Sequence, residues 1–126
     1  DRPRRRKARV ATLDFGSGAS QAFLMENAHR KHEQRSLLMH RLVADRLRQS
    51  PGDVVRFGLD NLQRWRQRGV DCEDFSMWDR LLQSGPERLL EILESDDEDA
   101  CRLRQSSPFA GLLSEEERGR IFAIVP

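Results

Sequence analysis

Apolar residues in this chain recur at helical spacing, and clusters of Gly, Pro and Ser separate the groups. The first helix is expected to span about residues 20–49. Its apolar side chains form one group around Phe23 and another around Leu42, and eight polar residues at 29–36 lie between them. Such a stretch cannot lie in a core. We expect either a bend, with Ser36 capping a new helix, or a solvated section of one helix.

The next predicted helix has clearer boundaries. Residues 50–53 read Ser-Pro-Gly-Asp, a start that resembles a capping box with Pro in the first turn, and Gly69 is expected to end the helix. Gly58 lies in the middle of this helix, where Gly costs about 1 kcal/mol relative to Ala. A close crossing with another helix would explain why a glycine is found there.

Three shorter helices are expected to follow. Asp71, with Asp74 three residues later, predicts the start of the third helix, and Gly85-Pro86 predicts the start of the fourth. Four consecutive acids at 96–99 suit the N-terminus of a fifth helix, because the macrodipole is positive at that end.

The last predicted helix begins at Ser114 in a capping box and is expected to turn Ile121 and Phe122 inward. No alternating pattern of the kind that predicts strands is present. The sequence therefore predicts an all-α fold: a compact bundle of five or six short helices, preceded by a flexible basic N-terminal arm. We expect residues 1–19 to form the arm and residues 20–126 to form a single helical domain.

Charge sets the start of the chain apart from the remainder. Six of the first nine residues are basic: Arg2, Arg4, Arg5, Arg6, Lys7 and Arg9. The whole chain carries only +1, so with Asp1 counted residues 1–9 carry +5 and residues 10–126 carry −4. A cationic arm on a mildly acidic body suits a polyanion or an acidic partner. Phe15, at the end of a short apolar stretch, is the apolar anchor with which the arm is expected to hold that partner.

Composition excludes several classes of protein. Two cysteines are too few for a disulfide framework and predict reduced thiols in a cytoplasmic protein. No apolar run approaches the roughly 18 residues that a membrane span needs, so no membrane partner is expected. Cys72 and Cys101 both have acidic neighbours, which makes them poor candidates for a catalytic nucleophile. We therefore expect no catalytic residues, and a protein that is not an enzyme.

One group of residues has a spacing that could bind a metal. Glu26 and His29 form a Glu-x-x-His motif, and Glu33 follows one helical turn after the histidine. A di-metal site in a helical bundle needs this motif twice, and it occurs once here. We expect neither a metal nor a cofactor. A small enzyme built on these residues and His32 is a third hypothesis for the function.

The most specific string in the sequence is Arg-Gln-Ser-Ser-Pro-Phe-Ala-Gly-Leu-Leu at 104–113, which we call the box. Pro108 disfavours helical geometry in the residue before it, so a helix is expected to end there. The box is either a buried connection between two helices or a recognition loop that presents its polar residues to a partner. The candidate recognition residues are Arg104, Gln105, Ser106, Ser107, Pro108 and Phe109.

Two further charged segments allow two interpretations each. The acids at 87–99 are either a solvated helix face or a mimic of nucleic acid that occupies a basic groove. The arginines at 64–68 around Trp65 either hold phosphates or provide the positive charge that a helix C-terminus favours. A helix-turn-helix within residues 50–83 is disfavoured, because its second helix starts with acids and has only Arg80 to reach a groove.

Three segments together suggest a family. His40–Ala44, Asn61–Trp65 and the box resemble segments of small, uncharacterised bacterial helical proteins that occur as partners or regulators in toxin–antitoxin-like loci. The resemblance covers about residues 36–125 and does not include the arm. It implies a partner-binding protein and transfers no catalytic residue.

The function expected from the sequence is a non-catalytic protein-binding module, the antitoxin or regulatory partner in a bacterial two-component locus. Its partner would be a toxin or enzyme from the same locus, and a homodimer is compatible with the pattern. The alternative is a nucleic-acid-binding protein whose basic arm contacts phosphates.

Overall fold

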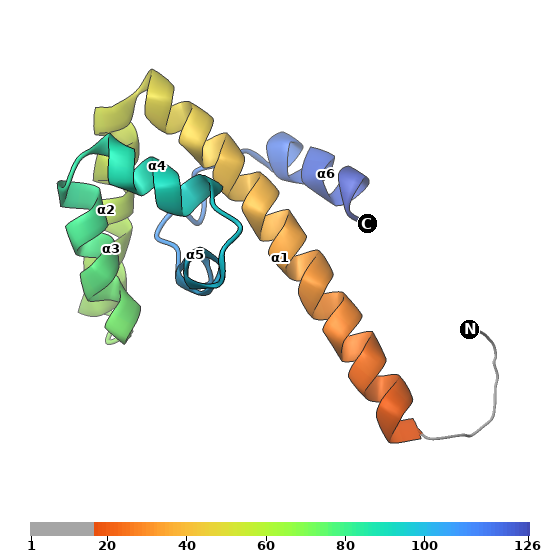
Figure 1. Ribbon diagram of the computed structural model, residues 1–126. Helices are drawn as coiled ribbons and strands as arrows, with labels where there is room; N and C mark the ends of the chain where they lie inside the picture. Colours follow the sequence, from red (N-terminus) through yellow and green to blue (C-terminus); the bar gives the residue numbers. More distant parts are fainter. Residues whose placement is uncertain (1–16) are drawn as a thin grey trace. The chain divides into compact units, whose positions relative to one another are not determined.

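The computed structural model describes residues 17–126, and these residues form six α-helices without a strand (Figure 1). The all-α prediction is confirmed. The helices are α1 (Ser17–Gln49), α2 (Pro51–Gln67), α3 (Glu73–Gln83), α4 (Pro86–Glu94), α5 (Glu98–Arg104) and α6 (Glu115–Ile124). The basic residues of the predicted arm and Phe15 lie outside the described residues.

The chain divides into two units, residues 1–32 and residues 33–126. The boundary after residue 19, between the predicted arm and the helical domain, stays a prediction. The described part of the first unit is the N-terminal half of α1, and the second unit contains the rest of α1 and the other five helices.

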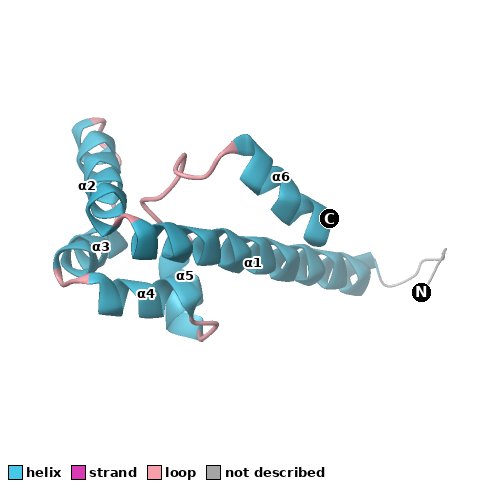
Figure 2. Ribbon diagram, turned by 90° about the horizontal axis from the view of Figure 1, so that it is seen from above, coloured by secondary structure: helices cyan, strands magenta, loops and turns pink. Residues whose placement is uncertain are grey.

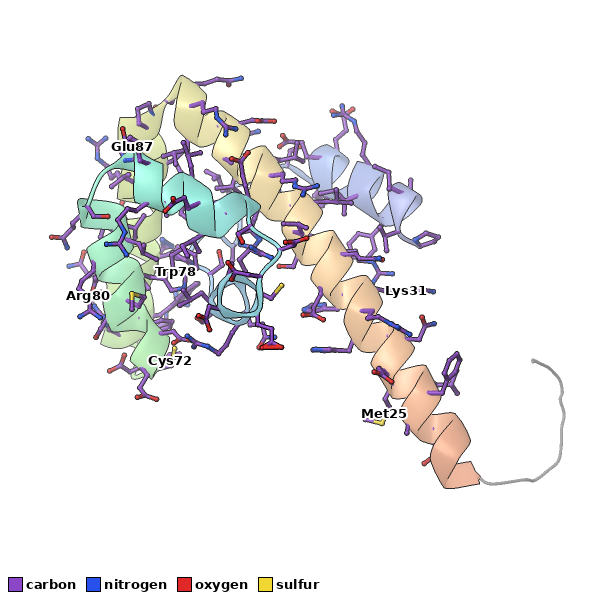
Figure 3. The ribbon with its side chains drawn as sticks, viewed as in Figure 1. Met25, Lys31, Cys72, Trp78, Arg80 and Glu87 are labelled. Carbon is purple, nitrogen blue, oxygen red and sulfur yellow. The ribbon has the colours of Figure 1, made fainter. Side chains whose placement is uncertain are left out.

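The core of the second unit is built around Trp78 of α3, which is completely buried and points into the interior (Figure 3). Its ring meets Phe109 edge-on, with 5.9 Å between the ring centroids and 89° between the planes. Leucines of α3 and of four other helices complete the core, among them Leu47, Leu62, Leu89 and Leu103. These side chains occupy the helical spacing that the sequence showed, so burial of their faces drives the packing.

α1 has 33 residues and is not a short helix. It continues through residues 29–36, so the predicted bend with a new helix capped by Ser36 is wrong, and the solvated-section alternative describes this stretch. His29 to His32 are exposed, and Ser36 is half-buried. No Gly or Pro occurs between Ala19 and Gln49, so nothing in the backbone interrupts the helix.

The helix starts are only partly as predicted. Ser50 occupies the N-cap of α2, but its side chain makes no capping hydrogen bond. α3 starts after Cys72, so Asp71 is not its cap. Asp97 caps α5 by accepting from the backbone N–H of Ala100 at 2.8 Å.

The capping box of α6 is confirmed. Ser114 Oγ accepts from the Glu117 N–H at 3.1 Å, and the Glu117 carboxylate accepts from the Ser114 N–H at 2.9 Å. Gly69 ends α2 as predicted, with a positive φ of 84°. The N–H groups of Gly69 and Val70 then bond back to the carbonyls of Arg66 and Trp65, which satisfies the last turn of the helix.

Within the second unit, Arg35 of α1 holds the C-terminal end of α6. Ile121 is buried as predicted, but Phe122 is 49% exposed and does not point inward. The Arg35 guanidinium lies over the Phe122 ring at 4.6 Å, and Arg35 Nε donates to the Val125 carbonyl at 2.8 Å. This cation–π contact leaves one face of the aromatic ring in solvent.

Gly58 lies at a close helix crossing, as the sequence predicted. A Cβ built on Gly58 would meet both Leu82 methyl groups at 3.1 Å and the Phe109 ring at 3.2 Å. α2 can therefore approach α3 and the box only because this position has no side chain.

Gly58→Val is expected to destabilise the fold by about 2 kcal/mol, because its methyl groups overpack the core against Leu82 and Phe109. Urea unfolding measures the change. Gly119→Val is the matched control, because a Cβ on that helical glycine meets nothing within 4 Å, and it should change stability by less than about 0.5 kcal/mol. Equal losses in the two variants would contradict the close crossing.

Candidate functional site

The box starts at the last residue of α5, Arg104, and continues through the loop between α5 and α6 (pink in Figure 2). Side chains from other helices hold this loop. The buried Asn61 of α2 donates from Nδ2 to the carbonyls of Pro108 at 2.8 Å and Ala110 at 3.1 Å. Its other amide atom, Oδ1, accepts from Arg64 at 2.7 Å. One amide therefore satisfies two loop carbonyls that no secondary structure could satisfy.

Two further helices donate to the carbonyl just before the box and to a carbonyl near its end. Trp78 Nε1 of α3 lies 3.1 Å from the Leu103 carbonyl and 3.3 Å from Ser106 Oγ. Arg46 Nη1 of α1 donates to the Leu112 carbonyl at 2.9 Å. Donors from α1, α2 and α3 thus converge on a single loop, which supports the interpretation of the box as a buried helix connection.

Arg104 is the most deeply buried charge among the described residues, at 3% exposure. Its Nη1 donates to the carbonyls of Ile92 at 2.8 Å and Ser95 at 2.5 Å, where α4 ends. Its Nη2 lies 3.3 Å from Cys101 Sγ, and its Nε has no partner in the structure. The guanidinium therefore binds the negative end of the α4 macrodipole instead of a carboxylate.

Three of the candidate recognition residues lie in the interior of the second unit. Arg104, Pro108 and Phe109 are buried and cannot contact a partner in this conformation. Gln105 is exposed, and Ser106 and Ser107 are half-buried. Arginine side chains usually face solvent, but the carbonyls at the end of α4 draw the side chain of Arg104 inward.

His40 is a second buried titratable group. Its Nδ1 lies 2.6 Å from the Ser36 carbonyl, to which the neutral imidazole donates. Burial lowers the pKa of His40 from 6.5 to about 4, and the nearby positive charge of Arg104 acts in the same direction. His40 is therefore an uncharged part of the core at neutral pH.

The arginines around Trp65 are largely engaged within the fold. Arg66 forms an ion pair with Asp79 at 2.6 Å, and its guanidinium lies 5.8 Å from the centre of the Phe75 ring. The hydrogen bond to Asp79 raises the pKa of Arg66. This arrangement favours a structural role over phosphate binding. α3 begins with Glu73 and Asp74, which supports the argument against a recognition helix.

In the acidic segment at 87–99, some carboxylates form ion pairs or hydrogen bonds within the fold and others do not. Glu94 pairs with Arg48 at 2.6 Å. The hydrogen bond from the Ala100 N–H lowers the pKa of Asp97. Glu87 and Glu91, in contrast, are exposed and form no ion pair within residues 17–126 (Figure 3 labels Glu87).

The described residues contain no group of three or more His, Cys, Asp or Glu side chains that could hold a metal ion. Cys72 is exposed and Cys101 is half-buried, and both are free thiols. None of the helices described is long and apolar enough to cross a membrane.

An exposed apolar turn in α1 is the feature that the sequence analysis missed. Phe23, Leu24 and Met25 are 63%, 62% and 72% exposed (Met25 is labelled in Figure 3). We call these three residues the apolar turn. Helical spacing alone suggested a buried face here. The useful signal was the three apolar residues in succession, because they spread over more than half of the helix circumference.

Comparison with protein-family models, with curated proteins and with solved structures finds no significant match to this chain.

The titration of His40 predicts a specific loss of stability in mild acid. The pKa is about 4 in the folded state against 6.5 when unfolded, so the unfolded chain binds the proton more tightly. The contribution of His40 to the free energy of unfolding is complete above pH 6.5. Below that pH it falls by about 1.4 kcal/mol per pH unit, and the total loss is about 3 kcal/mol near pH 4.

Urea unfolding between pH 7 and pH 5 measures this slope, and this window lies above the titration of the carboxylates. His40→Gln should remove most of the slope, whereas His32→Gln, a change at an exposed histidine, should keep it. An identical slope in His40→Gln and the original chain would contradict the burial of a neutral imidazole.

Proposed function

We propose that this protein is a non-catalytic protein-binding module, the antitoxin or regulatory partner of a protein from the same two-component bacterial locus. The observation that carries the proposal is the apolar turn of α1, with Phe23, Leu24 and Met25 more than 60% exposed. Large apolar side chains are common singly at protein surfaces, but three in succession on one helical turn mark an interaction site.

Covering this turn would contribute substantial binding energy. Complete burial of a Phe, Leu or Met side chain is worth about 1.5–3 kcal/mol. Successive helical positions differ by about 100°, so three of them cover about 200° of the circumference. A single flat surface covers only part of such an arc, which favours a partner that contacts the helix from two sides, as a groove between two helices does.

Charge indicates the chemistry of that groove. Arg30 and Lys31 follow the apolar turn on the same helix, are exposed, and form no ion pair within the described residues. The six cations of residues 1–9 precede it in the sequence. An apolar groove with carboxylates on its rim would complement both features, and the charges would accelerate association.

The polar contacts of the box support the scaffold part of the proposal. Asn61, Trp78 and Arg46 fix the loop between α5 and α6. This gives the box the role of holding the C-terminal helices together and leaves α1 as the recognition element.

Nucleic-acid binding is the second candidate, because six cations among nine residues could neutralise several phosphates. Such binding would weaken steeply with salt and would show little sequence preference. Replacing the six cations with Gln would then reduce affinity for every sequence to a similar extent.

Affinity capture with the full chain from nuclease-treated lysate of the native host tests the leading proposal. We expect a stoichiometric protein partner that is reduced at least tenfold by Leu24→Glu/Met25→Glu. Ile124→Glu is the matched control, because it places the same charge on an exposed apolar residue of α6 and should leave capture unchanged.

A partner that binds the Leu24→Glu/Met25→Glu variant as well as the original chain would contradict a role for the apolar turn. Loss of every partner after nuclease treatment, with nucleic acid in the untreated sample, would favour the second candidate instead.

A further inference from the structure

The two units of this chain carry opposite charge. Residues 1–32 contain eight Lys or Arg and three Asp or Glu, which gives +5 with neutral histidines. Residues 33–126 contain fourteen Lys or Arg and eighteen Asp or Glu, which gives −4. Two copies of the chain therefore attract each other when the first unit of one faces the second unit of the other.

The negative charge of the second unit is concentrated on α4 and the start of α5. Residues 87–99 contain seven carboxylates and one arginine. Five of the acids are exposed and form no ion pair or side-chain hydrogen bond within residues 17–126: Glu87, Glu91, Asp96, Glu98 and Asp99. This concentration remains after the internal pairing of Glu94 with Arg48.

The spacing of these charges suits a helix lying against them. Glu87, Glu91 and Glu94 are four and three residues apart and share one face of α4 over about 10 Å, with the half-buried Leu90 beside them. Leu24 and Lys31 are also seven residues apart, or about 10 Å along α1. A cationic helix with an apolar turn thus has a counterpart of similar length on the second unit.

We propose that a second copy of this chain covers the apolar turn in a reciprocal dimer, in which α1 of each copy lies against α4 and α5 of the other. The proposal goes beyond the proposed function and does not require a partner protein. In a cell that contains such a partner, the dimer keeps the apolar turn covered until the partner displaces the second copy.

The area of the apolar turn favours the reciprocal arrangement over a single contact. Three side chains of this size at the observed exposure offer on the order of 400 Å². A stable interface buries about 800 Å² on each partner. One contact falls short of this, whereas a two-fold dimer uses the apolar turn twice and adds the charged residues at each contact.

Sedimentation velocity of the full chain from about 1 to 200 μM tests the proposal. At 50 mM NaCl we expect a reversible monomer–dimer equilibrium, with a dissociation constant that rises at least tenfold at 500 mM NaCl because salt screens the charges. Leu24→Glu/Met25→Glu should remain monomeric throughout, and Ile124→Glu should dimerise like the original chain.

Charge reversal identifies the two surfaces. Arg30→Glu/Lys31→Glu and Glu87→Lys/Glu91→Lys should each be monomeric alone, with circular dichroism confirming that both are folded. An equimolar mixture of the two should dimerise, because each reversed surface then faces an opposite charge on the other copy.

A chain that stays monomeric at 200 μM in 50 mM NaCl would overturn the proposal, and so would a mixture of the two reversed variants that stays monomeric. A dimer unaffected by Leu24→Glu/Met25→Glu would also overturn it. None of these results would bear on capture of a partner protein from lysate, so failure of the dimer and failure of the proposed function can be distinguished.

Discussion

The fold of the second unit depends on a guanidinium that is buried without a carboxylate. A buried cation is tolerated only where acceptors replace its water, and Arg104 finds them in the carbonyls of Ile92 and Ser95. These carbonyls lie at the end of α4 and have no helical hydrogen-bond partner. The contact therefore gives the guanidinium its acceptors and the carbonyls their donor. Because Arg104 is the last residue of α5, the contact fixes the turn between α4 and α5 and positions the start of the box.

In the rest of the box, too, side-chain donors satisfy backbone carbonyls of the loop. Leucines and Trp78 supply most of the burial energy, but apolar contacts alone are compatible with several packings. Hydrogen bonds from Asn61 and Arg46 have directions, so they select one path for the loop between α5 and α6. The second unit is thus a defined scaffold, and the exposed apolar residues Phe23, Leu24 and Met25 of α1 lie in the first unit.

Local signals in the sequence predicted most helix boundaries. Pro51, Gly69 and Ser114 act within one turn of their own position, so their meaning does not depend on the fold. The errors concern residues whose partners are distant in sequence. Phe122 stays at the surface because Arg35 lies over it, and Arg104 is buried because α4 happens to end beside it. The hydrophobic periodicity of a helix contains no information about such pairs. The apolar turn is the opposite case: helical spacing predicted that its residues are buried in the core, and they are exposed.

Urea unfolding of Arg104→Ala beside Arg102→Ala tests the central role of the buried guanidinium most directly. The two arginines lie in the same helix, but Arg102 is exposed and pairs with Asp74 at the surface. Our account predicts a loss of about 3–5 kcal/mol for Arg104→Ala, because two buried carbonyls lose their donor and a cavity opens. It predicts less than about 1 kcal/mol for Arg102→Ala. Similar small losses in both variants would show that the fold does not depend on Arg104.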